Sequence, residues 1–114
     1  MLKLKVIRCN TPVWLANARV DVVIIRGGTQ GQLASGYTDL TGYVEFSFQN
    51  LQDGDEAHVT VTPSGESSDS DHVFDWVTDE RNESAWQLGS QQGKDCPDSW
   101  YDVTNQIIQV TYHT

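Results

Sequence analysis

Carboxylates in two short groups are the first side chains of this chain that could do chemistry. One group runs from Asp53 to Glu56, and the other contains Asp69, Asp71 and Asp75. Calcium takes about six to eight oxygen ligands, commonly from several carboxylates. Neither group forms the Asp-x-Asp-x-Asp-Gly loop with a trailing glutamate, and Asp53-Gly54 is typical of a hairpin turn. We therefore expect no metal and no cofactor.

The histidines and nucleophiles do not form a known catalytic pattern. His58, His72 and His113 are the histidines of the chain, and no Gly-x-Ser-x-Gly elbow, phosphate-binding loop or His-Glu-x-x-His motif occurs. Paired carboxylates could in principle act on a glycoside. With 16 acidic residues, however, some must lie close together by chance. We expect a protein that is not an enzyme, and a carboxylate-based enzyme is the competing hypothesis.

Aromatic residues among acids in the second half are better candidates for ligand binding. Trp100 and Tyr101 stand between Asp98 and Asp102, and Trp76 follows an earlier acidic stretch. Aromatic side chains anchor many protein interfaces, and an aromatic face beside acids also suits a sugar. The alternative is that these tryptophans fill the core, where each buries a large apolar area. These five residues are the candidate ligand-binding set.

Composition narrows the classes of partner. The chain has 114 residues, which suggests one domain over 1–114, and a formal net charge of −9. An acidic chain argues against nucleic acid and against anionic membranes, because both are bound through Lys and Arg. No apolar run approaches the roughly 20 residues that span a bilayer. The first residues alternate charged with apolar side chains, which predicts a strand rather than a signal peptide.

The two cysteines leave two alternatives open. Cys9 and Cys96 lie far apart, without the spacing of a zinc site. They could form one disulfide from the first strand to a late loop, or remain two free thiols.

Alternating apolar residues and turn signals predict an antiparallel β-sandwich or barrel without helices. Val23 and Ile25 add apolar residues to the face opposite Val20 and Val22, which suggests that a flap or a dimer contact covers that second face. Long polar loops separate the later strands, within 63–105. The expected strands are a first strand containing Leu2, Leu4 and Val6, followed by 18–26, 32–38, 43–48, 57–61, 72–77, 85–88 and 106–113.

Ordered short motifs resemble a known family over about residues 3–62. They are Pro12-Val13, Ala-x-Val-x-Val from Ala18, Thr-Asp-x-x-Gly-x-Val from Thr38, and Leu-x-x-Gly from Leu51. This pattern resembles the carboxypeptidase regulatory-like domains, which belong with transthyretin-like and collagen-adhesin B-type modules. The resemblance implies an immunoglobulin-like or transthyretin-like Greek-key sandwich of seven or eight antiparallel strands, followed here by the loops at 63–105 and a last strand at 106–113.

Two chemistries of that family can be tested against the residues. The related hydroxyisourate hydrolases end in Tyr-Arg-Gly-Ser, whereas this chain ends Tyr112-His113-Thr114. The adhesin modules often join a lysine to an asparagine or an aspartate through an isopeptide bond. Lys3 and Lys5 alternate away from the apolar face, and a solvated lysine is a poor nucleophile. We therefore expect neither chemistry here.

The resemblance favours a non-enzymatic accessory module, a spacer or protein-recognition domain of a larger exported or surface assembly. Its expected partner is a protein or a neighbouring domain, and a homodimer is a further alternative. A carbohydrate-binding module that uses the aromatic and acidic residues of 63–102 is the competing hypothesis from another class.

Overall fold

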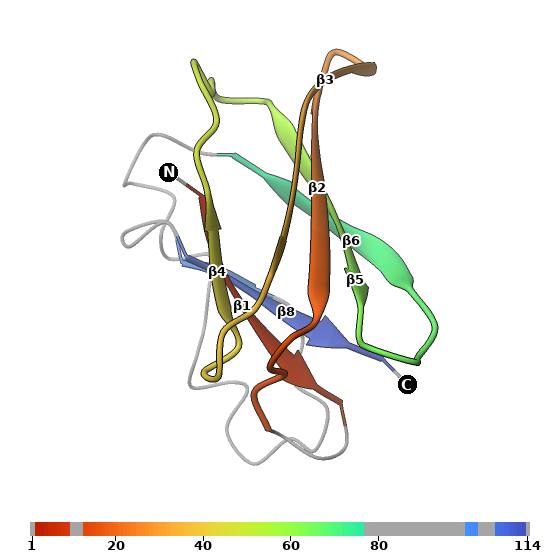
Figure 1. Cartoon of the computed structure of the whole chain (residues 1–114). Helices are drawn as coiled ribbons and strands as arrows, with labels where there is room; N and C mark the ends of the chain where they lie inside the picture. Colours follow the sequence, from red (N-terminus) through yellow and green to blue (C-terminus); the bar gives the residue numbers. More distant parts are fainter. Residues whose placement is uncertain (1, 10–12, 77–99, 103–106, 114) are drawn as a thin grey trace.

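The computed structural model describes residues 2–9, 13–76, 100–102 and 107–113. They form two packed four-stranded sheets, a β-sandwich (Figure 1). No helix in this part of the chain is long and apolar enough to span a bilayer. The strands are β1 (Leu2–Arg8), β2 (Arg19–Arg26), β3 (Thr29–Tyr37), β4 (Tyr43–Phe46), β5 (Glu56–Thr62), β6 (Asp69–Asp75), β7 (Trp100–Asp102) and β8 (Ile107–Tyr112).

One strand pairing departs from the predicted antiparallel arrangement. The sheets have the orders β4-β1-β8-β7 and β3-β2-β5-β6. The pairs β1–β4, β7–β8, β2–β3, β2–β5 and β5–β6 are antiparallel, but β1 and β8 run parallel. The predicted all-β sandwich is confirmed, and its fully antiparallel character is wrong for this pair. Alternation has a period of two residues in either direction, so it cannot reveal which way a strand runs.

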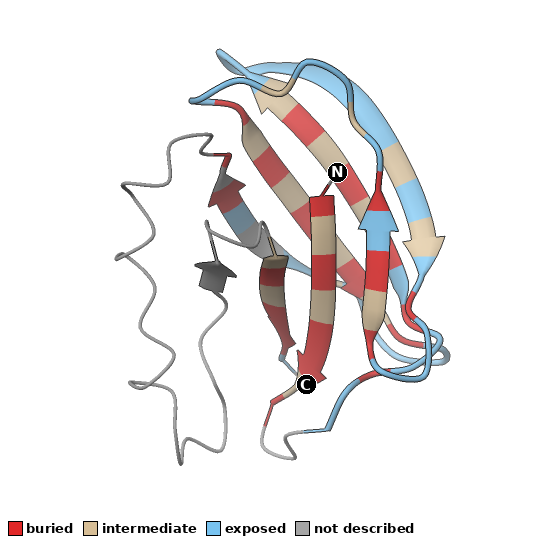
Figure 2. Ribbon diagram, turned by 90° about the vertical axis from the view of Figure 1, so that its left-hand side faces the viewer, coloured by how far each residue is buried: buried red, intermediate tan, exposed pale blue. Residues whose placement is uncertain are grey.

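The core follows the alternation that the sequence displays. In β2, and in β1 as far as Val6, every second residue is buried, and Figure 2 shows this as bands of red between tan along the strands. Ile7, next to Val6, is buried as well. Lys3 and Lys5 lie on the outward face of β1 as predicted, and the Lys5 Nζ atom sits 4.3 Å from the centre of the Trp14 ring. The core cluster consists of Leu2, Leu4, Val6, Leu15, Ala18, Val20, Val22, Ile24, Val44, Phe46, Ala57, Val59, Val61, Phe74, Trp76, Ile108, Val110 and Tyr112.

The turn from Thr38 to Gly42, the most specific part of the family-like pattern, has a structural task. The Thr38 hydroxyl is buried, accepts a hydrogen bond from the Ala18 amide at 3.0 Å and donates one to the Leu15 carbonyl at 2.6 Å. Asp39 Oδ1 accepts bonds from the backbone amides of residues 41 and 43. The Thr38 bonds tie the end of β3 to the segment before β2, and the Asp39 bonds close the turn onto the start of β4. The motif therefore has a scaffold role.

Glycine is required at the end of this turn. Gly42 has φ +76°, and a Cβ added there would lie 2.8 Å from the Val6 carbonyl oxygen and 3.1 Å from Trp14 Cβ. The Gly42 carbonyl in turn accepts the Val6 amide at 2.9 Å. The turn is therefore pressed against β1 with no room for a side chain.

Several strand bounds differ from those predicted. β3 begins at Thr29 rather than 32, and β6 begins at Asp69, inside a stretch expected to be a polar loop. β7 was not predicted at all, because its three residues are too few for alternation to show. The expected strand at 85–88 lies outside the described residues.

Candidate functional site

The outward side of the β3-β2-β5-β6 sheet carries a row of three aliphatic residues and one histidine. We call this side the outer face, and its central row is Leu33, Val23, His58 and Val73, one residue from each strand in direct register. Leu33 is 75% exposed and Val73 is 51% exposed. Ile25 lies farther along β2, also on the outer face and partly exposed. Val23 thus belongs to this row and Ile25 to the same partly exposed face, rather than to a second core.

A shallow hollow of about 330 Å³ lies in the middle of this face. Strands form its floor and the side chains of three strands form its walls. The Asp21 carboxylate stands at one side, where it accepts hydrogen bonds from the Ser35 hydroxyl and from Arg19 Nε at 3.1 Å. The lining residues are Asp21, Val22, Val23, Leu33, Ala34, Ser35, His58 and Thr60.

The acids of the outer face flank its central row. On one side of the row, Asp21 pairs with Arg19. On the other, Glu56 Oε1 lies 3.2 Å from His58 Nε2. An apolar strip bordered by polar groups is the pattern of a protein-docking surface, since such interfaces bury an apolar centre inside a polar rim.

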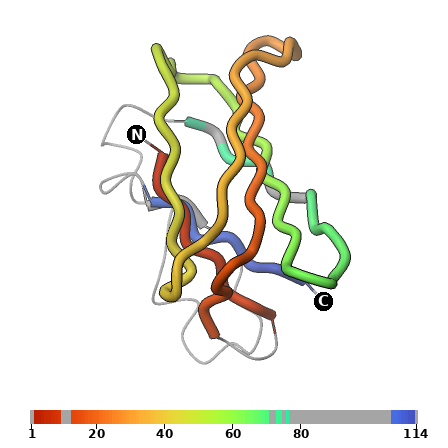
Figure 3. The backbone as a smooth tube through the Cα atoms, in the orientation of Figure 1, coloured from red at the N-terminus to blue at the C-terminus, as the bar shows by residue number. Residues whose placement is uncertain are grey.

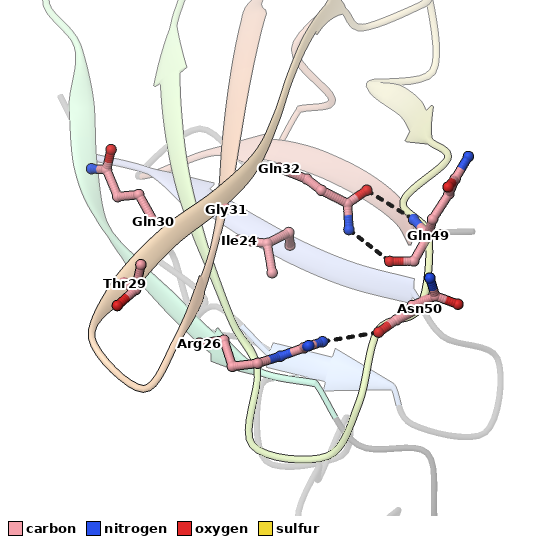
Figure 4. Close-up of a pocket in the computed structure, with 8 residues that line it drawn as sticks. All are labelled: Ile24, Arg26, Thr29, Gln30, Gly31, Gln32, Gln49 and Asn50. Carbon is pink, nitrogen blue, oxygen red and sulfur yellow. Dashed lines mark hydrogen bonds between the residues drawn. The ribbon is translucent and has the colours of Figure 1, made fainter.

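A second concavity, the end pocket, opens where the β2–β3 hairpin and the segment after β4 rise side by side at one end of the sandwich (Figure 3). It encloses about 430 Å³, within the range of small-molecule sites. The Gln32 side chain bridges the two walls of the pocket. Its Nε2 atom donates to the Gln49 backbone carbonyl at 2.6 Å, and its Oε1 atom accepts from the Gln49 backbone N–H at 2.8 Å (Figure 4). The lining residues are Ile24, Arg26, Thr29, Gln30, Gly31, Gln32, Gln49 and Asn50.

Arg26 and Asp55 fix the shape of the end pocket. The guanidinium donates from Nε to Asp55 Oδ1 at 2.6 Å and from Nη2 to Oδ2 at 2.8 Å, and Nη2 also reaches the Asn50 carbonyl at 2.9 Å. The side chain of Asp55 is only 1% exposed. The hydrogen bonds from Arg26, supported by the Gln52 amide and opposed by desolvation, lower the pKa of Asp55 to about 2. Because the two charges cancel, the pocket is polar without a net charge from this pair.

One acid of the first candidate metal group has other partners, whereas the side chains of Asp71 and Asp75 in the second group lie outside what the structure describes. Asp55, one of the acids of the 53–56 group, is occupied by Arg26 and Gln52. In the described part of the chain no three His, Cys, Asp or Glu residues are grouped as metal ligands would be. Sequence reasoning identified the turn at Asp53-Gly54 but missed Arg26, which has no local signal because its partner lies on another strand.

The five predicted ligand-binding residues are only partly described. Trp76 is buried, with 7% of its surface exposed, and belongs to the core cluster, so its ring offers little surface to a ligand. Trp100 and Asp102 pair in β7 with Gln109 and Ile107 of β8, and Tyr101 pairs with Ile108. Asp98 lies outside the described residues, so the site built on these five residues stays a prediction.

Cys9 takes part in a disulfide, and no described cysteine is free. Cys96, the other cysteine of the sequence, lies outside the described residues.

Comparison with known proteins gives no relative: no family model, no curated protein and no solved structure matches this chain. The outer face and the end pocket therefore have to be interpreted from their own chemistry.

Proposed function

We propose that this chain is a non-enzymatic β-sandwich accessory module that recognises a protein partner or a neighbouring domain through its outer face. The observation that carries the proposal is the row formed by Leu33, Val23, His58 and Val73, in which both end residues are aliphatic and largely exposed. Exposed aliphatic side chains on a rigid sheet stabilise a complex by the water that they release. The sandwich holds the outer face rigid, and the outer face contacts the partner.

The charge of the chain indicates the chemistry of the partner. The net charge is −9, and acids border the aliphatic row at Asp21 and Glu56. A partner with an apolar centre and a rim of Lys and Arg would complement both features. Its association rate should fall as salt is added, because screening weakens the attraction between the two rims.

We further propose that the fold belongs to the transthyretin-like Greek-key class, within a larger exported or surface assembly. Two observations support this class. The chain passes back and forth between the two sheets, with β4 in one sheet between β3 and β5 in the other. The family-like turn Thr38–Gly42 is also held by hydrogen bonds of its own Thr38 hydroxyl and Asp39 carboxylate.

Site-specific photo-crosslinking tests the docking function. A benzophenone side chain is placed at Val73, on the outer face, and at Leu40, a turn residue that is 88% exposed and serves as the matched control. Each protein is irradiated in extract from its source cells, the captured protein is purified, and its affinity is measured by calorimetry against the wild type and Val23→Lys. We expect capture from Val73 alone, and binding that weakens with Val23→Lys and with salt. Equal capture from Leu40, or an unchanged affinity for Val23→Lys, would refute the outer face as the docking surface.

Carbohydrate binding is the second candidate, and the end pocket favours it. Its lining offers the amides of Gln30 and Asn50 and the hydroxyl of Thr29 around a charge-balanced arginine, which suits neutral hydroxyl groups better than anions. Nuclear magnetic resonance titration with neutral mono- and disaccharides tests this alternative. Side-chain amide shifts that Gln30→Ala abolishes would support it, and the absence of any shift would exclude it.

A further inference from the structure

The four sheet edges in the described part of the chain are not protected alike. The order of the strands places β3 and β6 at the edges of one sheet and β4 and β7 at the edges of the other. β6 contains three aspartates, β4 contains Glu45 and β7 contains Asp102. β3, with the sequence TQGQLASGY, contains neither a charged residue nor a proline. Charges and prolines are the usual means by which proteins keep strand edges from pairing with other chains, so β3 is the edge without such protection.

The exposed side chains of β3 are arranged symmetrically. The strand is exposed along most of its length, as the pale blue ribbon in Figure 2 shows. An irregularity near Thr29–Gln32 shifts its register with β2, so the regular part runs from Leu33 to Tyr37. Leu33 is 75% exposed and Tyr37 is 65% exposed, and both lie on the outer face, two residues to either side of Ser35. Small residues, Ala34 and Gly36, occupy the positions between them.

We propose that two copies of this chain pair through β3, antiparallel, about a two-fold axis at Ser35. In this register Leu33 of each copy lies opposite Tyr37 of the other, and the two serines face each other at the axis. The two exposed apolar side chains thereby form two cross-strand aliphatic–aromatic pairs, which stabilise antiparallel strands. The unpaired backbone groups of both edges are satisfied as well, and the four strands of each copy join into one sheet of eight.

A second copy fits this edge better than an unrelated strand does. An isologous contact needs a surface that is complementary to itself, and the Leu-Ala-Ser-Gly-Tyr segment meets this requirement about its middle residue. The chain as a whole repels itself at −9, but the nearest acid to the axis, Asp21, lies one strand away and is paired with Arg19. Across the dimer the two Asp21 residues would be three strand spacings apart, roughly 14 Å. This exceeds the Debye length of about 8 Å at physiological salt. Pairing through β6 would instead bring two rows of aspartates together.

Sedimentation velocity of the purified chain over a concentration series tests this proposal independently of the proposed function. We expect a monomer–dimer equilibrium for the wild type. Leu33→Lys should weaken the dimer at least about tenfold, because it removes both cross-strand pairs. Val73→Lys, an exposed aliphatic-to-lysine change on the opposite edge strand, is the matched control and should leave the equilibrium unchanged. Circular dichroism verifies that each variant is folded.

A double variant tests the register itself. Leu33→Lys combined with Tyr37→Glu places an introduced lysine opposite an introduced glutamate at both symmetry-related positions, so dimerisation should return, and high salt should weaken it. A wild type that stays monomeric at millimolar concentration, a dimer that Leu33→Lys and Val73→Lys weaken equally, or a double variant that fails to recover dimerisation would overturn the proposal.

Discussion

Substitution of Gly42 by alanine tests the interpretation of the family-like turn as a scaffold element. The residue has φ +76°, and the new Cβ would lie 2.8 Å from the Val6 carbonyl oxygen, which also accepts the Leu15 amide. An L-residue in the left-handed region costs about 1–2 kcal/mol relative to glycine. The forced shift of backbone adds about 1–3 kcal/mol, as overpacking does elsewhere. We therefore expect Gly42→Ala to lower the free energy of unfolding by about 2–5 kcal/mol.

Gly28→Ala is the matched control for this experiment. Gly28 has nearly the same φ, +79°, but a Cβ added there meets nothing within 4 Å. This variant should lose only the conformational part, about 1–2 kcal/mol. Urea denaturation followed by tryptophan fluorescence measures both free energies, and with a slope of about 2 kcal/mol per M the two midpoints should differ by roughly 1 M. Equal midpoints for the two variants would refute the steric argument, because conformation alone would then explain both losses.

Three further predictions concern buried polar contacts. Asp55 has its pKa lowered from 3.8 to about 2, mainly by Arg26. The ionised carboxylate therefore stabilises the fold above pH 4, and this contribution should be lost as the pH falls from about 4 to about 2. We expect a contribution on the order of 1–2 kcal/mol, because Arg26 is half exposed and water screens the pair. Acid denaturation of Asp55→Asn should lack this step, and an unchanged acid limb would contradict the assignment. Arg26→Ala should lower the free energy of unfolding at neutral pH by about 2–3 kcal/mol, because the buried Asp55 carboxylate loses two hydrogen-bond donors. Urea denaturation at pH 7 and at pH 3 measures this loss, which should be smaller at pH 3. Thr38→Val should lower the free energy of unfolding by about 1–3 kcal/mol, because the Ala18 amide and the Leu15 carbonyl lose their hydrogen bonds. Thr38→Ser keeps the hydroxyl and should lose less stability, and urea denaturation measures both variants.

The sequence predicted the inward faces well, because burial on one side of a sheet imposes a period of two. Val20 and Val22 of β2 and Val59 and Val61 of β5 are buried as alternation required. Val23 illustrates the limit of that pattern. Its apolar character suggested a covered second face, but only the register across the sheet shows that it lies in a row with exposed neighbours.

The candidate sites were harder to predict than the fold. Trp76 stood among acids in the sequence and was a candidate for ligand contact, yet it packs in the core, since local polarity does not determine which way a ring turns. The Arg26–Asp55 pair joins residues on different elements, and no short-range pattern links them. The end pocket depends on this pair and on the Gln32–Gln49 bridge, so it becomes visible only once the strands are assembled.

The parallel pairing of β1 with β8 has a consequence for how the molecule folds. Leu4 of the first strand is neighboured by Val44 of β4 on one side and by Ile108 of β8 on the other. The central strand of that sheet therefore stays half unpaired until the last strand has left the ribosome. Contacts between distant parts of a chain slow folding, and an unpaired apolar strand is open to misassembly in the meantime. Removal of β8 would therefore expose one whole edge of β1, which would keep only its pairing with β4.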